Sequence, residues 1–145
     1  MFILAANSYR RVTPVQWTEP KLLIADDDRD FRESLGEVFE RRGYSTRLAA
    51  DGCEAVEIVQ SSSELHLLIL DVHMPRLTGL QALEQIRHIV ESSLPCILMS
   101  AKLDESIVRQ AKELRSASLL AKPFTLRAVT ATVEEILRAS YGWSL

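Results

Sequence analysis

Leu68-Ile69-Leu70-Asp71-Val72-His73-Met74-Pro75 lies near the middle of this 145-residue chain and predicts an interior β-strand that ends on an acid. An uninterrupted apolar run of this kind is typical of a strand buried on both faces, as in a parallel sheet. The proline then stops further strand pairing. Asp71 taken alone would be interpreted as a turn residue, because aspartate before a loop is common. A functional interpretation of Asp71 depends on the residues at the ends of the other predicted strands.

Short apolar runs alternate with amphipathic stretches five times between Lys21 and the C-terminal region. The predicted strands are 21–25, 45–48, 68–71, 94–99 and 117–121. The predicted helices follow Asp28, follow Asp51-Gly52, begin near Gly79, run from Glu105 to Leu114, and begin near Thr125. This alternation with short loops predicts an α/β fold, in which helices cover both faces of a parallel sheet.

The composition indicates one globular domain, with 47% hydrophobic and 26% charged residues. A net charge of -3 gives no electrostatic reason to expect nucleic acid or an acidic membrane as a direct partner. Cys53 and Cys96 lie far apart and do not have the spacing of metal ligands. We therefore expect both to be free thiols in a reducing cytosol. No apolar run approaches the roughly 20 residues of a membrane helix. Met1–Ala6 lacks the features of a signal peptide, so we expect a cytoplasmic protein.

Polar side chains stand at the carboxyl ends of four of the predicted strands, which meet at one edge of a parallel sheet. In chain order these side chains are Asp26, Asp27, Asp28, Asp71, Ser100 and Lys122. Clustered carboxylates raise one another's pKa unless a cation neutralises them. Carboxylates, a backbone carbonyl and waters suit octahedral Mg²⁺, and no His or Cys set has zinc spacing.

An aspartate beside Mg²⁺ and a lysine can accept a phosphoryl group as an acyl phosphate. The metal and Lys122 would stabilise charge on the phosphoryl oxygens, and the Ser100 hydroxyl would donate to the same oxygens. The strand ends therefore predict a site where one of the aspartates can accept a phosphoryl group.

From about Lys21 to Ala139 the chain resembles the receiver domain of bacterial two-component response regulators. The matching segments are Ala25-Asp26-Asp27-Asp28, Asp71-Val72-His73-Met74-Pro75 with Gly79-Leu80, Ser100-Ala101, and Lys122-Pro123-Phe124. Each segment is weak alone, but their order and separation on the strand ends are specific. The resemblance implies a flavodoxin-like, doubly wound sheet of five parallel strands in the order 2-1-3-4-5, with five helices.

The resemblance also implies roles for the acids. Asp71 would be the phosphoacceptor and, together with Asp27, would bind Mg²⁺. The backbone carbonyl of His73 would be a further metal ligand, and Asp26 would act through a metal-bound water. We expect the side chain of His73 to lie at the solvent-facing rim, and His66 and His88 to have no chemical role.

Lys122 would pair with the phosphoryl group, and Ser100 would be the switch hydroxyl that moves toward it. Many relatives carry an aromatic residue where this chain has Leu119, so the switch would work here without rotation of an aromatic ring. Relatives also often have Gly-Ala where this chain has Arg115-Ser116. We expect that loop to differ, because glycine reaches positive φ without strain.

The resemblance implies a stand-alone receiver that takes phosphate from a histidine kinase or a phosphotransfer protein, and that is not an enzyme toward other substrates. It would bind a downstream protein through the face of the fourth helix, fifth strand and fifth helix, with homodimer formation left open. One alternative is an interaction module that works without phosphorylation, and another is the receiver fragment of a larger regulator. A Mg²⁺-dependent phosphohydrolase ranks below these, because no cap or substrate pocket is evident beyond the core fold.

We divide the chain into an irregular N-terminal arm over residues 1–20, a receiver domain over 21–140, and a short tail over 141–145.

Overall fold

β4 (Leu67–Asp71) lies at the centre of a five-stranded parallel sheet, and all of its residues are buried. The computed structural model describes residues 19–62, 64–90 and 94–145. Over these residues the strand order is β3-β2-β4-β5-β6, which is 2-1-3-4-5 in chain order. The predicted architecture is confirmed. The predicted arm over 1–20 lies outside the described residues except for Glu19 and Pro20.

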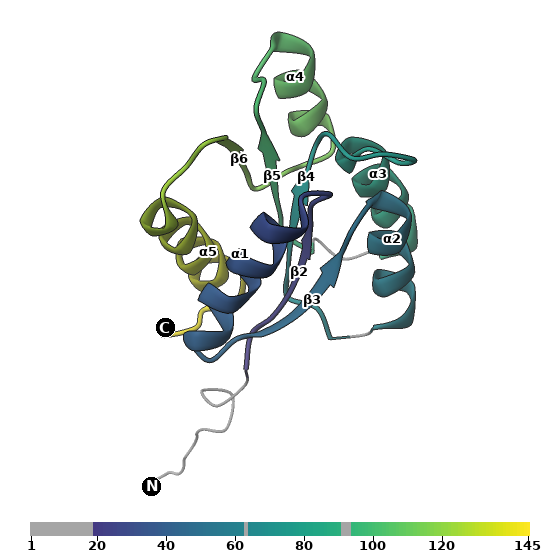
Figure 1. Cartoon of the computed structure of the whole chain (residues 1–145). Coiled ribbons are helices and arrows are strands. Elements are labelled where there is room, and N and C mark those ends of the chain that lie inside the picture. The colour runs from purple at the N-terminus through teal and green to yellow at the C-terminus, as the bar shows by residue number, and fades with distance from the viewer. Residues whose placement is uncertain (1–18, 63, 91–93) are drawn as a thin grey trace, which may run out of the picture.

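The remaining elements alternate along the chain as the sequence pattern predicts (Figure 1). The other strands are β2 (Lys21–Ala25), β3 (Ser45–Ala49), β5 (Cys96–Ser100) and β6 (Ser118–Ala121). The helices are α1 (Arg29–Arg41), α2 (Gly52–Ser61), α3 (Gly79–Ile89), α4 (Glu105–Glu113) and α5 (Leu126–Tyr141). Within the described ranges, no helix has both the length and the apolar character needed to cross a membrane.

Each face of the sheet is covered by its own helices, because successive strand side chains point to opposite faces. Figure 1 shows α1 and α5 on one face and α2 and α3 on the other. The core under α2, α3 and α4 includes Leu23, Leu68, Leu70, Leu83, Leu98 and Ile107. The core under α1 and α5 includes Leu22, Ile24, Phe39, Ile69, Met99 and Val133. Burial of each such side chain stabilises the fold by about 1.5–3 kcal/mol, so both layers hold the sheet rigid.

The loop after α4 adopts a left-handed backbone without glycine. Arg115 has φ 58°, although a side chain disfavours that conformation. The half-buried guanidinium of Arg87 on α3 donates to the carbonyl oxygens of Leu114, Arg115 and Leu94. We expected the loss of glycine to remove this conformation, and the hydrogen bonds from Arg87 explain why the backbone nevertheless adopts it.

An aromatic cluster closes the amino-terminal end of the sheet. Tyr141 stacks on Trp143, and the ring of His66 meets both edge-on, with centroid distances of 5.4 and 4.8 Å. The Tyr141 hydroxyl donates to the His66 carbonyl oxygen at 2.8 Å, and the Lys21 backbone N–H donates to His66 Nδ1 at 3.0 Å. These contacts give His66 a structural role and attach the predicted tail to the domain.

We expect the stability of the protein to fall as pH drops below the ordinary His66 pKa of 6.5. Burial lowers this pKa, the Lys21 charge lowers it further, and Glu64 opposes them. The unfolded chain therefore binds this proton more readily, and protonation also removes the Nδ1 acceptor for Lys21. Urea denaturation at about pH 7.5 and about pH 5.5 should show a smaller pH effect in His66→Gln than in the wild type.

The matched control is His88→Gln. The His88 ring is exposed on α3, with Nδ1 2.8 Å from the Glu84 carbonyl oxygen, so this variant changes the same residue type outside the aromatic cluster. This variant should keep the full pH dependence of the wild type. Equal pH dependence in His66→Gln and the wild type would contradict the prediction.

Candidate functional site

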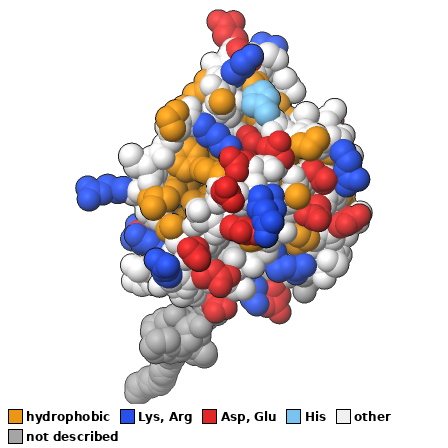
Figure 2. All heavy atoms as spheres, in the orientation of Figure 1, with side chains coloured by type: hydrophobic (Ala, Val, Ile, Leu, Met, Phe, Trp, Pro, Cys, Tyr) orange, Lys and Arg blue, Asp and Glu red, His pale blue; other side chains and the backbone are white. Residues whose placement is uncertain are grey.

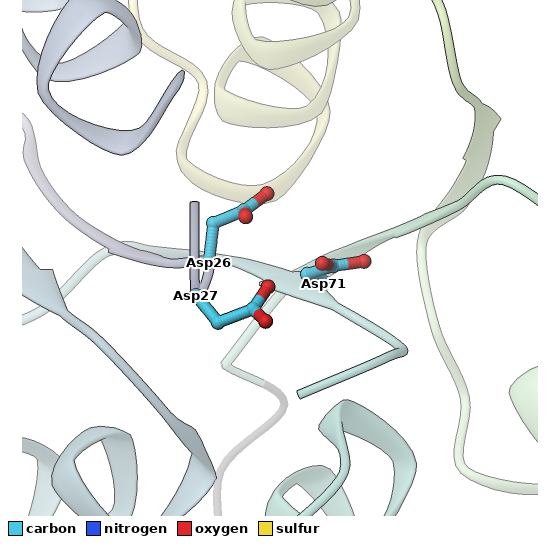
Figure 3. A group of neighbouring side chains, drawn as sticks. All are labelled: Asp26, Asp27 and Asp71. Atoms are coloured by element: carbon cyan, nitrogen blue, oxygen red, sulfur yellow. The ribbon is translucent and has the colours of Figure 1, made fainter. Parts of the chain in front are cut away.

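Three carboxylates meet at the carboxyl edge of the sheet. The register pairs Ala25 of β2 with Leu70 of β4, so Asp26 and Asp71 come next on neighbouring strands. One ligand oxygen each from Asp26, Asp27 and Asp71 lie within 4.8 Å of one another. Figure 3 shows these side chains together at the ends of the two strands, and Figure 2 shows acidic side chains gathered beside basic ones on one face. Asp26 and Asp71 are buried, whereas Asp27 is exposed.

Lys122, which follows β6, reaches two of these three acids. Its Nζ lies 2.6 Å from Asp26 Oδ2 and 3.4 Å from Asp71 Oδ2. The Phe31 ring of α1 packs over the ammonium group, with its centroid 4.5 Å from Nζ, and Phe124 meets Phe31 edge-on. A cation over an aromatic face is attracted by the ring quadrupole, so Phe31 helps to fix the position of Lys122.

The charges of the site are unbalanced. Burial raises the pKa of Asp71, and the Asp26 carboxylate raises it further, while Lys122 partly offsets both. Burial lowers the pKa of Lys122, but the two carboxylates outweigh it, so the net direction is upward. The cluster therefore holds three carboxylates, of which the one ammonium group contacts two. This donor set fits a hard divalent cation such as Mg²⁺, which prefers oxygen ligands.

The Asp26 segment is held by local hydrogen bonds. The Asp28 N–H donates to Asp26 Oδ1 at 2.9 Å, and Arg32 Nη1 donates to the Asp26 carbonyl oxygen at 2.7 Å. Asp28 also caps α1 by accepting from the Phe31 N–H. Of the three consecutive acids, Asp28 therefore has a structural role, and the other two face Asp71.

Residues 22–134 match the model of the response regulator receiver domain family. The chain belongs to this family. It is a receiver of two-component signal transduction.

The curated relatives include response regulator MprA of Mycobacterium avium, which is 36% identical over 118 residues. That alignment covers 81% of this chain and 51% of MprA. MprA of Mycobacterium tuberculosis is 36% identical over the same length, covering 50% of that protein. The receiver thus spans about half the length of the curated relatives that it matches.

Solved structures agree with the fold. Chemotaxis protein CheY4 of Vibrio cholerae superposes with a TM-score of 0.77 at 25% identity, covering 83% of this chain and all 100% of CheY4. A CheY-like receiver domain protein of Methanospirillum hungatei gives 0.80 at 20% identity, covering 84% of this chain and 96% of the other. The latter likeness supports the fold alone.

Ser100 of this receiver is buried at the end of β5, the strand that pairs with β4. Its hydroxyl donates to the Lys102 carbonyl oxygen and accepts from the Lys102 N–H at 3.0 Å. His73 Nε2 lies 3.2 Å from the same hydroxyl oxygen. The His73 side chain is exposed, as expected, but the sequence offers no signal for its contact with Ser100.

The predicted site residues therefore converge, with two additions. Asp26, Asp27, Asp71 and Lys122 form one cluster, and Ser100 lies near it through His73, whose N–H is 3.4 Å from Asp71 Oδ1. Phe31 and the imidazole of His73 are the additions. From the sequence, Phe31 was predicted only to pack in the core, because it lies on the apolar face of the first helix.

Gly79→Ala is expected to destabilise this receiver by about 1–3 kcal/mol, the usual cost of overpacking. The Gly79 N–H donates to the Val72 carbonyl oxygen at 3.0 Å, and an added Cβ would overlap the Asp71 carbonyl oxygen. Alanine normally stabilises a helix by about 1 kcal/mol relative to glycine, so a net loss is diagnostic. Urea denaturation measures it.

Gly36→Ala is the matched control, because its Cβ would meet the movable Leu48 Cδ2 at 3.2 Å instead of backbone. We expect a smaller loss there than at Gly79. A Gly79→Ala protein as stable as the wild type would show that α3 can shift away from the end of β4.

Proposed function

We propose that this receiver accepts a phosphoryl group on Asp71 from a phosphohistidine of a histidine kinase or of a phosphotransfer protein. The observation that carries the proposal is the Asp71 carboxylate, buried at the sheet edge within reach of Asp26, Asp27 and Lys122. An Asp71 carboxylate oxygen bonds to phosphorus while the phosphorus–nitrogen bond of phosphohistidine breaks. The leaving imidazole takes a proton, and the product is an acyl phosphate.

Asp27, Asp71 and the His73 backbone carbonyl would hold Mg²⁺, and Asp26 would act through a bound water. When bound, Mg²⁺ neutralises charge on the oxygens of the transferred phosphoryl group. The Lys122 ammonium, 3.4 Å from Asp71 Oδ2, is placed to pair with the same oxygens. Asp71 is thus the acceptor and Lys122 the charge partner within the chain.

Phosphorylation would act by biasing a two-state equilibrium of the domain, with Ser100 as the switch hydroxyl. A downstream protein would then bind to the face of α4, β6 and α5. Exposed aliphatic side chains at the beginning of both helices support this surface, with Leu103 46% and Leu126 56% exposed. We propose a cytoplasmic signalling role without direct contact to nucleic acid or membrane, and without enzymatic activity toward other substrates.

We propose that the receiver works as a separate protein. The alternative is a receiver within a larger regulator. It is supported by the alignments to MprA, which cover only about half the length of each MprA protein. The intact mass of the protein isolated from its native source distinguishes the two, because a larger regulator would exceed the 16.3 kDa of this chain.

Incubation with Mg²⁺ and acetyl phosphate, followed by intact mass spectrometry, tests the phosphoacceptor role. We expect a mass gain of one phosphoryl group that requires Mg²⁺ and is removed by hydroxylamine, which cleaves acyl phosphates. No mass gain would favour the phosphorylation-independent interaction module. Sustained turnover of a phosphate ester would favour the phosphohydrolase.

A further inference from the structure

The Ser100 hydroxyl uses its full hydrogen-bonding capacity. A serine hydroxyl has one proton to donate and two lone pairs that accept. The proton goes to the Lys102 carbonyl oxygen, and one lone pair accepts from the Lys102 N–H at 3.0 Å. The remaining lone pair faces His73 Nε2 at 3.2 Å. The side chain is fully buried, so water does not compete for these bonds.

This arrangement fixes the direction of the bond between His73 and Ser100. Because the hydroxyl proton points to Lys102, His73 Nε2 carries a hydrogen and is the donor. The hydroxyl then has no proton left for a group on Asp71. To donate to a phosphoryl oxygen there, the hydroxyl would have to give up its bond to the Lys102 carbonyl oxygen, and a movement of Oγ toward that group would also break its bonds to His73 and to the Lys102 N–H.

Residue identity matters at His73 and not at Lys102. The two Lys102 bonds come from its backbone, and any residue other than proline would form them. Among the three hydrogen bonds of the Ser100 hydroxyl, only the one to His73 is made by the partner's side chain. His73 also belongs to the Asp71 loop, since its N–H lies 3.4 Å from Asp71 Oδ1.

We propose that the His73 imidazole is a positioning residue that holds the Ser100 hydroxyl away from Asp71 in the unphosphorylated receiver. The inference rests on the proposed function and adds a regulator to the same site. The bond between His73 and Ser100 favours the unphosphorylated conformation and lowers the population that is ready to accept phosphate. Such a bias changes the apparent phosphorylation rate by the same factor as that population.

The experiment compares initial rates of phosphorylation by acetyl phosphate at saturating Mg²⁺. The four proteins are the wild type, His73→Ala, Ser100→Ala and the double variant. His73→Ala should react about fivefold faster than the wild type, the factor of one neutral hydrogen bond. In the Ser100→Ala background, the same change at His73 should have no effect, because the bond is already absent.

Two further variants isolate the hydrogen bond. His73→Gln keeps an N–H donor near the position of Nε2 and should return the rate toward that of the wild type. His88→Ala removes an exposed imidazole from α3 and should react at the wild-type rate. A His73→Gln rate as high as that of His73→Ala would overturn the proposal.

Nuclear magnetic resonance gives a readout that a merely structural contact would not move. The Lys102 amide donates to Ser100 Oγ, so its resonance reports the position of the hydroxyl. In unphosphorylated His73→Ala it should shift toward its position in the phosphorylated wild type. An unshifted resonance, or an equal acceleration with and without the Ser100 hydroxyl, would overturn the proposal.

The two proposals fail separately. A wild-type protein that never gains a phosphoryl group refutes the proposed function. A wild-type protein that is phosphorylated normally, with His73→Ala at the same rate, refutes the role of His73 alone.

Discussion

Asp71→Asn is expected to abolish phosphorylation by acetyl phosphate completely. The amide has the shape of the carboxylate but lacks the anionic oxygen that attacks phosphorus. It also removes one of the three carboxylates that meet at the sheet edge, so Mg²⁺ binding should weaken. Intact mass spectrometry with and without Mg²⁺ measures the loss.

The same substitution should leave the metal-free protein as stable as the wild type, or more stable. Burial and Asp26 raise the pKa of Asp71, so ionising Asp71 costs folded-state stability as pH rises above the ordinary value of 3.8. Asparagine does not ionise and avoids that loss. Thermal denaturation at neutral pH in the presence of a chelator checks this expectation.

Asp104→Asn is the control for Asp71→Asn. Asp104 caps α4 by accepting from the Ile107 N–H at 2.9 Å, and asparagine caps helices as well as aspartate. This variant should be phosphorylated like the wild type. A phosphoryl group that persists in Asp71→Asn, mapped to another acid by peptide analysis, would move the acceptor to that residue.

Asp27→Ala is expected to abolish Mg²⁺ binding, and with it the dependence of phosphorylation on Mg²⁺. Asp27 lies in the three-acid cluster but is exposed, so we expect its carboxylate to contribute to metal binding more than to packing. Its removal also relieves repulsion among the three acids. The melting temperature without metal should therefore hold or rise, and isothermal titration calorimetry should detect no Mg²⁺ binding.

Asp28→Ala is the matched control, because it changes the neighbouring acid in the same way. Asp28 caps α1, and loss of such a cap costs about 1 kcal/mol. This variant should keep Mg²⁺ binding and lose stability, the reverse of Asp27→Ala. If Asp27→Ala instead lowers the melting temperature markedly, Asp27 is structural and the metal-site assignment is wrong.

The sequence was sufficient for the fold and for the members of the acidic cluster. The apolar run at Leu68–Leu70 becomes the central strand, and the acids after Ala25 and Leu70 become neighbours through the β2–β4 register. The first result follows from a local pattern, whereas the strand order behind the second was implied by the resemblance to receiver domains. Parallel strands bring their carboxyl ends to one edge whatever the loops do.

Contacts between side chains that lie far apart in the sequence could not be predicted from it. Lys122 was predicted as the partner of a phosphorylated Asp71, but its Nζ lies closer to Asp26, at 2.6 Å, than to Asp71, at 3.4 Å. Tyr141 and Trp143 lie far from His66 in the sequence, yet all three rings pack together. Such contacts depend on the loop backbone and on side-chain rotamers.

What the chain's own pattern settles is therefore which chemical groups stand at the sheet edge: Asp26, Asp27, Asp71, Ser100 and Lys122. What only the packed structure decides is how these groups are held, as with Phe31 over Lys122 and His73 beside Ser100. Periodic burial is repeated along the sequence and can be recognised there. A hydrogen bond between two loops has no such period, because it is set by the single arrangement in which all neighbouring side chains fit.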